Sequence, residues 1–266
     1  MFDAIRHILM PSAPSPAIPG GRRVYAVGDI HGRLDLLTAL RGAIGEDDAL
    51  RAPAETTVVL LGDLIDRGPE SAGVIAFSRA WSDAEDLRIL CGNHEEMFLE
   101  SLENLDVFQH FLRFGGRETA LSYGIDRELF DNAPLGTAQR LMAEAVPETD
   151  IAFLHNLDDC LVIGDYLFVH AGIRPGLPLD RQASADMRWI REPFLSSRAD
   201  HRHFIVHGHT ITPEPEACAN RLGIDTGAYM TGRLTALGLE GTRRWLIEAR
   251  EETGRITVSV RALETV

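Results

Sequence analysis

The fold is decided by the stretch Val24-Tyr25-Ala26-Val27-Gly28-Asp29-Ile30-His31-Gly32. There a short apolar run ends in a glycine, which is followed by two side chains that can bind metal. Four further apolar runs end in similar polar clusters. They are residues 56–61 before Gly62-Asp63, residues 87–91 before Gly92-Asn93-His94, residues 166–169 before His170-Ala171-Gly172, and residues 204–206 before His207-Gly208-His209. Runs this short and this apolar are typical of strands buried on both faces.

The segments between the first three runs predict helices over residues 35–44 and 70–81. Strand, helix and strand in that order predict parallel βαβ units. Parallel sheets bind ligands at the carboxyl ends of their strands. We therefore expect the five polar clusters to meet at one edge of the fold.

The remaining segments predict helices and further strands around this core. Residues 101–150 are helical in pattern and predict an insert or cap beside the site. The segments 222–225, 234–239, 245–249 and 256–260 predict a second, largely antiparallel or mixed sheet packed on the first. The expected fold is an α/β (α+β) two-sheet β-sandwich flanked by helices. Residues 22–266 are expected to form a single domain after an N-terminal segment and proline-rich tether at residues 1–21.

The composition excludes several classes of function. The net charge of −14 argues against a nucleic-acid partner, because a polyanion would be repelled. All 26 basic residues are arginine, and without lysine neither Schiff-base catalysis nor a P-loop is possible. No apolar run approaches the roughly 20 residues of a membrane span, and the start lacks the layout of a secretory signal. With no cysteine framework either, we expect a cytoplasmic protein without integral membrane association.

The side chains after the predicted strands form a set of metal donors. They are Asp29, His31, Asp63, Asn93, His170 and His209. A mixed set of nitrogen and oxygen donors without thiolate suits manganese, iron or zinc better than magnesium or calcium. The Asp63 carboxylate has two oxygens and can bridge two cations, which at about 4 Å apart would hold a hydroxide between them. We expect two divalent ions, with manganese favoured.

Five ordered motifs carry a resemblance to a known family. They are GDIHG (28–32), GDLIDRG (62–68), GNHE (92–95), HAG (170–172) and GH (208–209). Together they resemble the phosphoprotein phosphatase (PPP) family of metallophosphoesterases. The segments DTGA (225–228) and GRLT (232–235) resemble its bacterial, phage-lambda-type branch of serine/threonine phosphatases.

The resemblance implies a role for each matching residue. It implies that Asp29, His31 and Asp63 hold the first metal, and that Asp63, Asn93, His170 and His209 hold the second. It further implies that His94 is the general acid, oriented by Asp66, and that Arg67 and Asn93 bind the phosphate. Arg191 is the candidate for a second arginine on the phosphate, with Arg188 and Arg174 as alternatives. One departure is Cys91, where many members have arginine, and this puts the substrate preference in question.

Two enzymatic functions follow from the resemblance. The first is a serine/threonine protein phosphatase, whose partner is a phosphorylated protein or a small phosphorylated substrate. The alternative is a symmetrical diadenosine tetraphosphatase, which would need an adenine-binding surface such as Phe111, Phe114 or Tyr123. A non-catalytic phosphate-binding protein is disfavoured because every expected ligand and the acid are present.

Four further residues have less specific expectations. His207 should face away from Phe204 and Val206 and support the site or the structure. Glu95 is expected at the start of a helix, facing its dipole, with support of the metal ligands as the alternative. Asp225 and Tyr229 should lie near the mouth of the site, in a structural role or in contact with substrate.

Overall fold

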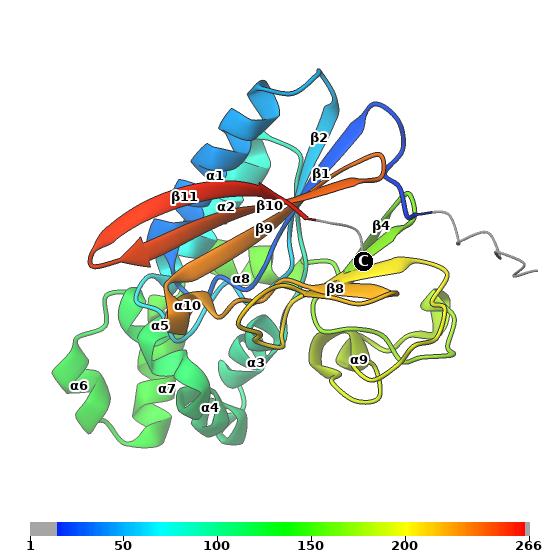
Figure 1. Ribbon diagram of the computed structural model, residues 1–266. Helices are drawn as coiled ribbons and strands as arrows, with labels where there is room; N and C mark the ends of the chain where they lie inside the picture. The colour runs from blue at the N-terminus through cyan, green and yellow to red at the C-terminus, as the bar shows by residue number, and fades with distance from the viewer. Residues whose placement is uncertain (1–14, 264–266) are drawn as a thin grey trace, which may run out of the picture.

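Two sheets pack face to face in the computed structural model, which describes residues 15–263 (Figure 1). The first has the order β11-β10-β9-β1-β2-β3. Its strands are β1 (Arg22–Val27), β2 (Glu55–Leu60), β3 (Leu87–Ile89), β9 (Arg233–Glu240), β10 (Arg243–Glu252) and β11 (Arg255–Ala262). Strands β1, β2 and β3 are parallel, as predicted, and β9 to β11 are antiparallel. The predicted N-terminal segment lies largely outside the described residues.

The second sheet has the order β4-β5-β6-β8-β7. Its strands are β4 (Cys160–Ile163), β5 (Tyr166–Val169), β6 (Phe204–His207), β7 (Glu216–Ala217) and β8 (Arg221–Gly223). Strands β5, β6 and β8 are parallel, whereas β4 and β7 are antiparallel edge strands. The carboxyl ends of its parallel strands therefore share one edge, as the carboxyl ends of β1 to β3 do.

Alternation along the strands builds two cores. Val24 and Ala26 of β1 point between the sheets, where they join Phe168 and Val206 of the second sheet. Tyr25 and Val27 point to the other face, which α1 (Leu34–Ala49) and α2 (Ser71–Ala84) cover. Because both faces of β1 are buried, its apolar run is nearly continuous. The predicted α/β sandwich is confirmed.

The region between β3 and β4 is helical, as its pattern predicts. It contains α3 (Asn93–Ser101), α4 (Leu105–Phe111), a π-helical turn (Leu112–Gly116), α5 (Arg117–Ser122), α6 (Arg127–Asn132), α7 (Leu135–Ala145) and α8 (Glu148–His155). Shorter helices follow at Leu179–Arg181, at α9 (Ser184–Trp189) and at α10 (Ala228–Thr231). Helix α5 packs on α2, which brings the helical region next to the loop after β2.

The sheet predicted for the segments after residue 222 is wrong. Segments 234–239, 245–249 and 256–260 are strands, but they belong to the first sheet, where β9 pairs with β1 in antiparallel register. Of these segments only 222–225 contributes to the second sheet, through β8. The physical reason is that the edge of β1 opposite β2 needs a hydrogen-bonding partner, and local alternation does not reveal which edge a strand fills.

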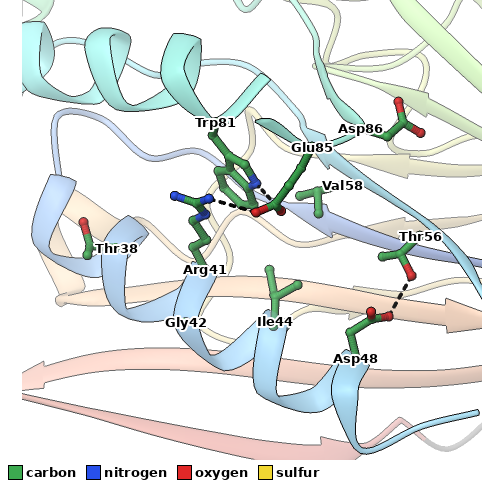
Figure 2. Close-up of a pocket in the computed structure, with 11 residues that line it drawn as sticks. Thr38, Arg41, Gly42, Ile44, Asp48, Thr56, Val58, Trp81, Glu85 and Asp86 are labelled. Carbon is green, nitrogen blue, oxygen red and sulfur yellow. Dashed lines mark hydrogen bonds and ion pairs between the residues drawn. The ribbon is translucent and has the colours of Figure 1, made fainter. Parts of the chain in front are cut away.

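A cavity of about 690 Å³ lies between α1 and α2, near the amino end of β2 (Figure 2). Its lining includes the buried side chains of Ile44, Val58 and Trp81. At its rim Arg41 donates to Glu85 at 2.8 Å, and the Trp81 indole donates to the other Glu85 oxygen at 2.7 Å. The polar groups at this rim therefore bond to one another.

Candidate metal centre

The predicted donors converge at the carboxyl ends of the strands. Asp29, Asp63 and Asn93 follow β1, β2 and β3, whereas His170 and His209 follow β5 and β6. Together with His31, each of these residues is at most 7% exposed. The two sheets thus bring residues 180 positions apart in the sequence to one buried cluster, since the amide of His209 donates to both carboxylate oxygens of Asp29 at 3.1 and 3.0 Å.

Asp63 lies at the centre of the cluster. Its Oδ2 is 3.6 Å from Nε2 of His31, and its Oδ1 is 3.4 Å from Nε2 of His170. Two groups of donors share this carboxylate, namely His31 with His94 and His170 with His209, and within each group the donor atoms lie within 4.8 Å of one another. Asn93 Oδ1 lies 3.1 Å from Nε2 of His170. Asp63 therefore has the position of a bridging ligand.

Hydrogen bonds orient the imidazoles so that one nitrogen of each faces the cluster. Nδ1 of His31 donates to the carbonyl of Ile65 at 2.7 Å, and Nδ1 of His170 donates to that of Leu61 at 2.8 Å. This fixes the tautomer and points each Nε2 lone pair inward. Nε2 of His209 is buried without a hydrogen-bond partner among residues 15–263. Such an orphaned acceptor is expected where a metal completes the site.

The backbone of the cluster is strained. His31, Asp63, Asp66, Arg67 and His209 all have φ between 48° and 72°, and they are five of the seven non-glycine residues with positive φ in the described part of the chain. A left-handed residue of this kind costs on the order of 1–2 kcal/mol. The surrounding structure maintains this strain at the site.

The electrostatics of the cluster favour cations. Burial tends to raise the pKa of Asp63, but the surrounding imidazoles outweigh it and hold the pKa well below its usual range. Burial raises the pKa of Asp29, and repulsion from the carboxylates of Asp225 and Asp63 raises it further. Burial lowers the pKa of His209 to about 3, which keeps its ring neutral. Neutral imidazoles beside crowded carboxylates are the donor forms that two divalent cations require, so the residues fit a dimetal centre.

His94 and Asp66 form a buried pair beside this cluster. Nδ1 of His94 lies 2.6 Å from Oδ2 of Asp66, and the hydroxyl of Thr119 donates to the other Asp66 oxygen at 2.6 Å. Burial alone would lower the pKa of His94, but the carboxylates of Asp63 and Asp66 outweigh it and raise that pKa. The imidazole can therefore hold a proton near the metal donors.

Two of the predicted arginines lie at the cluster. The guanidinium of Arg67 donates to Nε2 of His31 at 2.6 Å and to Nε2 of His94 at 2.9 Å. Arg191 donates to the carbonyl of His209 at 3.5 Å. The alternatives are engaged elsewhere, because Arg188 pairs with Glu96 and Asp159 and Arg174 pairs with Asp186.

The sequence model of the calcineurin-like phosphoesterase family matches residues 22–236. The chain belongs to this family. The predicted resemblance to the phosphoprotein phosphatases is confirmed, and the chain is a hydrolase of the metallophosphoesterase class. This family uses a dimetal centre, and the chain has groups of His and Asp side chains that could hold metal.

Relatives in this family differ in their named substrates. The chain is 29% identical over 224 residues to Serine/threonine-protein phosphatase 1 of Salmonella typhimurium, covering 80% of this chain and 90% of that protein. It is 28% identical over 232 residues to the asymmetrical bis(5'-nucleosyl)-tetraphosphatase PrpE of Anoxybacillus flavithermus, covering 79% and 88%. A solved structure of a putative diadenosine tetraphosphatase shares the fold, with a TM-score of 0.58 at 20% identity over 93% of this chain and 99% of that one.

Glu95 has more contacts with the site than its expected position at a helix start indicates. It is fully buried in the first turn of α3, and its carboxylate accepts the amide hydrogens of Asp63, Leu64 and Gly92 at 2.8–2.9 Å. It thus fixes the loop that presents the Asp63 carboxylate in this calcineurin-like phosphoesterase. The GNHE motif contained the signal, since a glutamate three residues into a helix can accept backbone amides.

Asp225 and His207 also had less specific expectations. Asp225 is buried and its carboxylate raises the pKa of Asp29 by repulsion. His207 faces away from the sheet-to-sheet core, as expected, and its Nε2 lies 3.2 Å from Arg221. Thr119, from the helical region, had no signal in the sequence because its partner Asp66 is 53 residues away.

Proposed function

We propose that this protein is a phosphomonoester hydrolase acting on phosphoserine and phosphothreonine of proteins. The observation that carries the proposal is the 2.6 Å contact between His94 and Asp66 beside the donors that share Asp63. A protonated imidazole next to a metal centre supports proton donation to a poor leaving group such as a serine alkoxide.

In this proposal the six donors hold two cations. Asp29, His31 and Asp63 would hold one, and Asp63, Asn93, His170 and His209 the other. Two divalent cations, when bound, supply Lewis acidity to the phosphate and make water nucleophilic at neutral pH. Manganese as the metal, and the cytoplasm as the location, are proposals that rest on the sequence alone.

His94 provides the proton for the leaving oxygen. Its Nδ1–H donates to Asp66, so Nε2 is the atom directed at the centre. When the ring is charged, Nε2 carries the second proton and no longer accepts from Arg67. Thr119 holds the second oxygen of Asp66, which restricts rotation of the carboxylate. The pair is therefore oriented before substrate arrives.

The phosphate oxygens would be bound by Arg67 and Asn93, with Arg191 on the side of the second donor group. A guanidinium offers several donors in one plane and suits a phosphate with three terminal oxygens. Because the chain contains no lysine, arginine is the side-chain cation available for this role.

A dinucleoside tetraphosphate is the second candidate substrate, favoured by the relatives named as tetraphosphatases. Of the three aromatic side chains predicted for an adenine surface, Phe111 is fully buried and Tyr123 bonds to Asp150. Only Phe114, 45% exposed and next to the Arg67 contact residue Gly115, could meet a base. This reduced surface favours the phosphoprotein substrate.

The test compares kcat/KM for a phosphoserine peptide and for a dinucleoside tetraphosphate with manganese present. We expect the peptide to be the better substrate. His94→Asn should lower kcat on the peptide by at least about 100-fold. The loss should be smaller on an aryl phosphate with an acidic leaving group. Equal losses on both substrates would remove the acid role, and a preference for the tetraphosphate would establish the second candidate.

A further inference from the structure

Tyr229 lies over the site on the short helix α10. The helix is bounded by Gly227 and Gly232, whose φ values of 70° and 69° give tight turns on both sides. The Tyr229 ring meets the edge of His31 at 5.3 Å between centroids, and the Cζ atom of Arg67 lies 4.8 Å from the ring centroid. The ring is half-buried.

Arg67 is held by contacts of different kinds. Its backbone amide donates to the carbonyl of Gly115 at 3.1 Å. A Cβ atom at Gly115 would lie 2.6 Å from Arg67 Cγ, so the absent side chain makes room for the arginine stem. The guanidinium nitrogens contact His31 and His94, and its Cζ atom lies over the Tyr229 ring.

These contacts are not equally available to Arg67 once metal ions are bound at the site. The hydrogen bond to His31 uses the Nε2 lone pair that a cation would take. The hydrogen bond to His94 is lost when that ring carries its acid proton on Nε2. The backbone contact with Gly115 fixes the start of the side chain but leaves its rotatable bonds free. The contact with the aromatic ring of Tyr229 remains. Such a cation–π contact restricts the long Arg67 side chain before phosphate binds, so less conformational entropy is lost on binding.

We propose that Tyr229 is a positioning residue that holds the Arg67 guanidinium for phosphate binding. The inference rests on the proposed phosphate-binding role of Arg67. The Tyr229 hydroxyl donates no hydrogen bond to residues 15–263 in the structure, so the ring and not the hydroxyl carries the role. Phenylalanine should therefore replace tyrosine without loss.

A direct contact between Tyr229 and the substrate's organic group is the competing explanation. The two differ in what happens with inorganic phosphate, which has no organic group. If Tyr229 acts through Arg67, loss of Tyr229 weakens the binding of inorganic phosphate and of every phosphomonoester by the same factor. If it contacts the leaving group, inorganic phosphate is unaffected.

The experiment uses the full chain loaded with manganese. Calorimetry gives the Kd for inorganic phosphate, and steady-state kinetics give kcat and KM for an aryl phosphate. Tyr229→Ala should raise both Kd and KM by about three- to tenfold with kcat within about twofold. Tyr229→Phe should match the wild type, and so should Met230→Ala, a control on the same helix whose side chain is 63% exposed. Metal content and Tm show whether each variant is intact.

An Arg67→Ala background separates this inference from the proposed function. There Tyr229→Ala should cause no further change in the Kd for phosphate, because its effect acts through the missing guanidinium. An undiminished effect in that background, or a wild-type Kd for Tyr229→Ala alone, would overturn the positioning role. If Arg67→Ala itself leaves the Kd unchanged, the proposed role of Arg67 fails instead.

Discussion

The two ends of β2 differ in how their polar groups are satisfied. At the amino end, beside the cavity of about 690 Å³, Thr56 donates to Asp48 at 2.7 Å and Arg41 donates to Glu85 (Figure 2). At the carboxyl end, Asp63 faces imidazoles with inward lone pairs, and Nε2 of His209 has no partner among residues 15–263.

The backbone differs in the same way. The residues lining the cavity include none of the positive-φ residues, whereas Asp63, Asp66 and Arg67 all lie within seven residues of the end of β2 and have positive φ. The comparison teaches that convergent, unsatisfied donors on a strained backbone mark a reactive site better than empty volume does.

Removing the shared carboxylate should give the largest effect. Asp63→Ala takes one ligand from both cations and leaves the imidazoles without their common partner. We expect kcat to fall by at least about 1,000-fold and bound manganese to fall well below two per chain. Glu85→Gln at the other end of β2 is the control and should keep both values. A variant lacking Asp63 that still holds two ions would break the distinction between the ends.

The carboxylate that supports the Asp63 loop should have a smaller effect. Glu95→Gln keeps the shape but replaces one of the acceptor oxygens with an NH₂ group facing backbone donors. We expect manganese affinity to fall by about 10- to 100-fold, the range for groups that orient ligands. Titration with manganese measures it directly. Unchanged affinity would mean that the strained loop holds its shape without Glu95.

The pH dependence tests the His94–Asp66 pair. Burial lowers the pKa of His94, but Asp63 and Asp66 outweigh it, so the ring stays protonated above its usual range. In its proposed role of general acid, His94 is active below this pKa, and kcat should fall as pH rises through it. Asp66→Asn removes one of the raising groups, so the alkaline limb should move to lower pH. A pH–kcat profile that keeps its alkaline limb in this variant would contradict the pairing.

Alanine substitutions at glycines near the two ends of β2 should give the smallest effects. A Cβ atom at Gly42 or Gly45 of α1, beside the cavity, would meet nothing within 4 Å. Alanine at each should raise the free energy of unfolding by up to about 1 kcal/mol, because it favours the helix. Activity should not change. At Gly62, with φ of 100°, a Cβ atom would lie 2.7 Å from the Gly92 nitrogen, so Gly62→Ala should lower Tm and activity together.

Much of the site could be predicted because the ends of its strands can be recognised in the sequence. The apolar runs before Gly28 and Gly62 fix where each strand stops, and parallel pairing then brings Asp29 and Asp63 together. The motifs named the other donors by resemblance. In the structure His31, Asp63, His170 and His209 belong to the two donor groups, Asn93 contacts His170, and the amide of His209 donates to Asp29.

The parts that could not be predicted depend on contacts between distant residues. Alternation identifies β9 as a strand but does not say that it pairs with β1. The role of Glu95 depends on backbone amides about 30 residues away, and that of Thr119 on a helix packing beside Asp66. Local pattern carries no information on such partners.

The most direct test of the centre is a crystal structure of the manganese-loaded protein with anomalous scattering. Two manganese peaks should lie within about 4 Å of each other on either side of the Asp63 carboxylate, with His209 bound to one of them. A single peak, or two peaks away from Asp63, would contradict the shared dimetal centre.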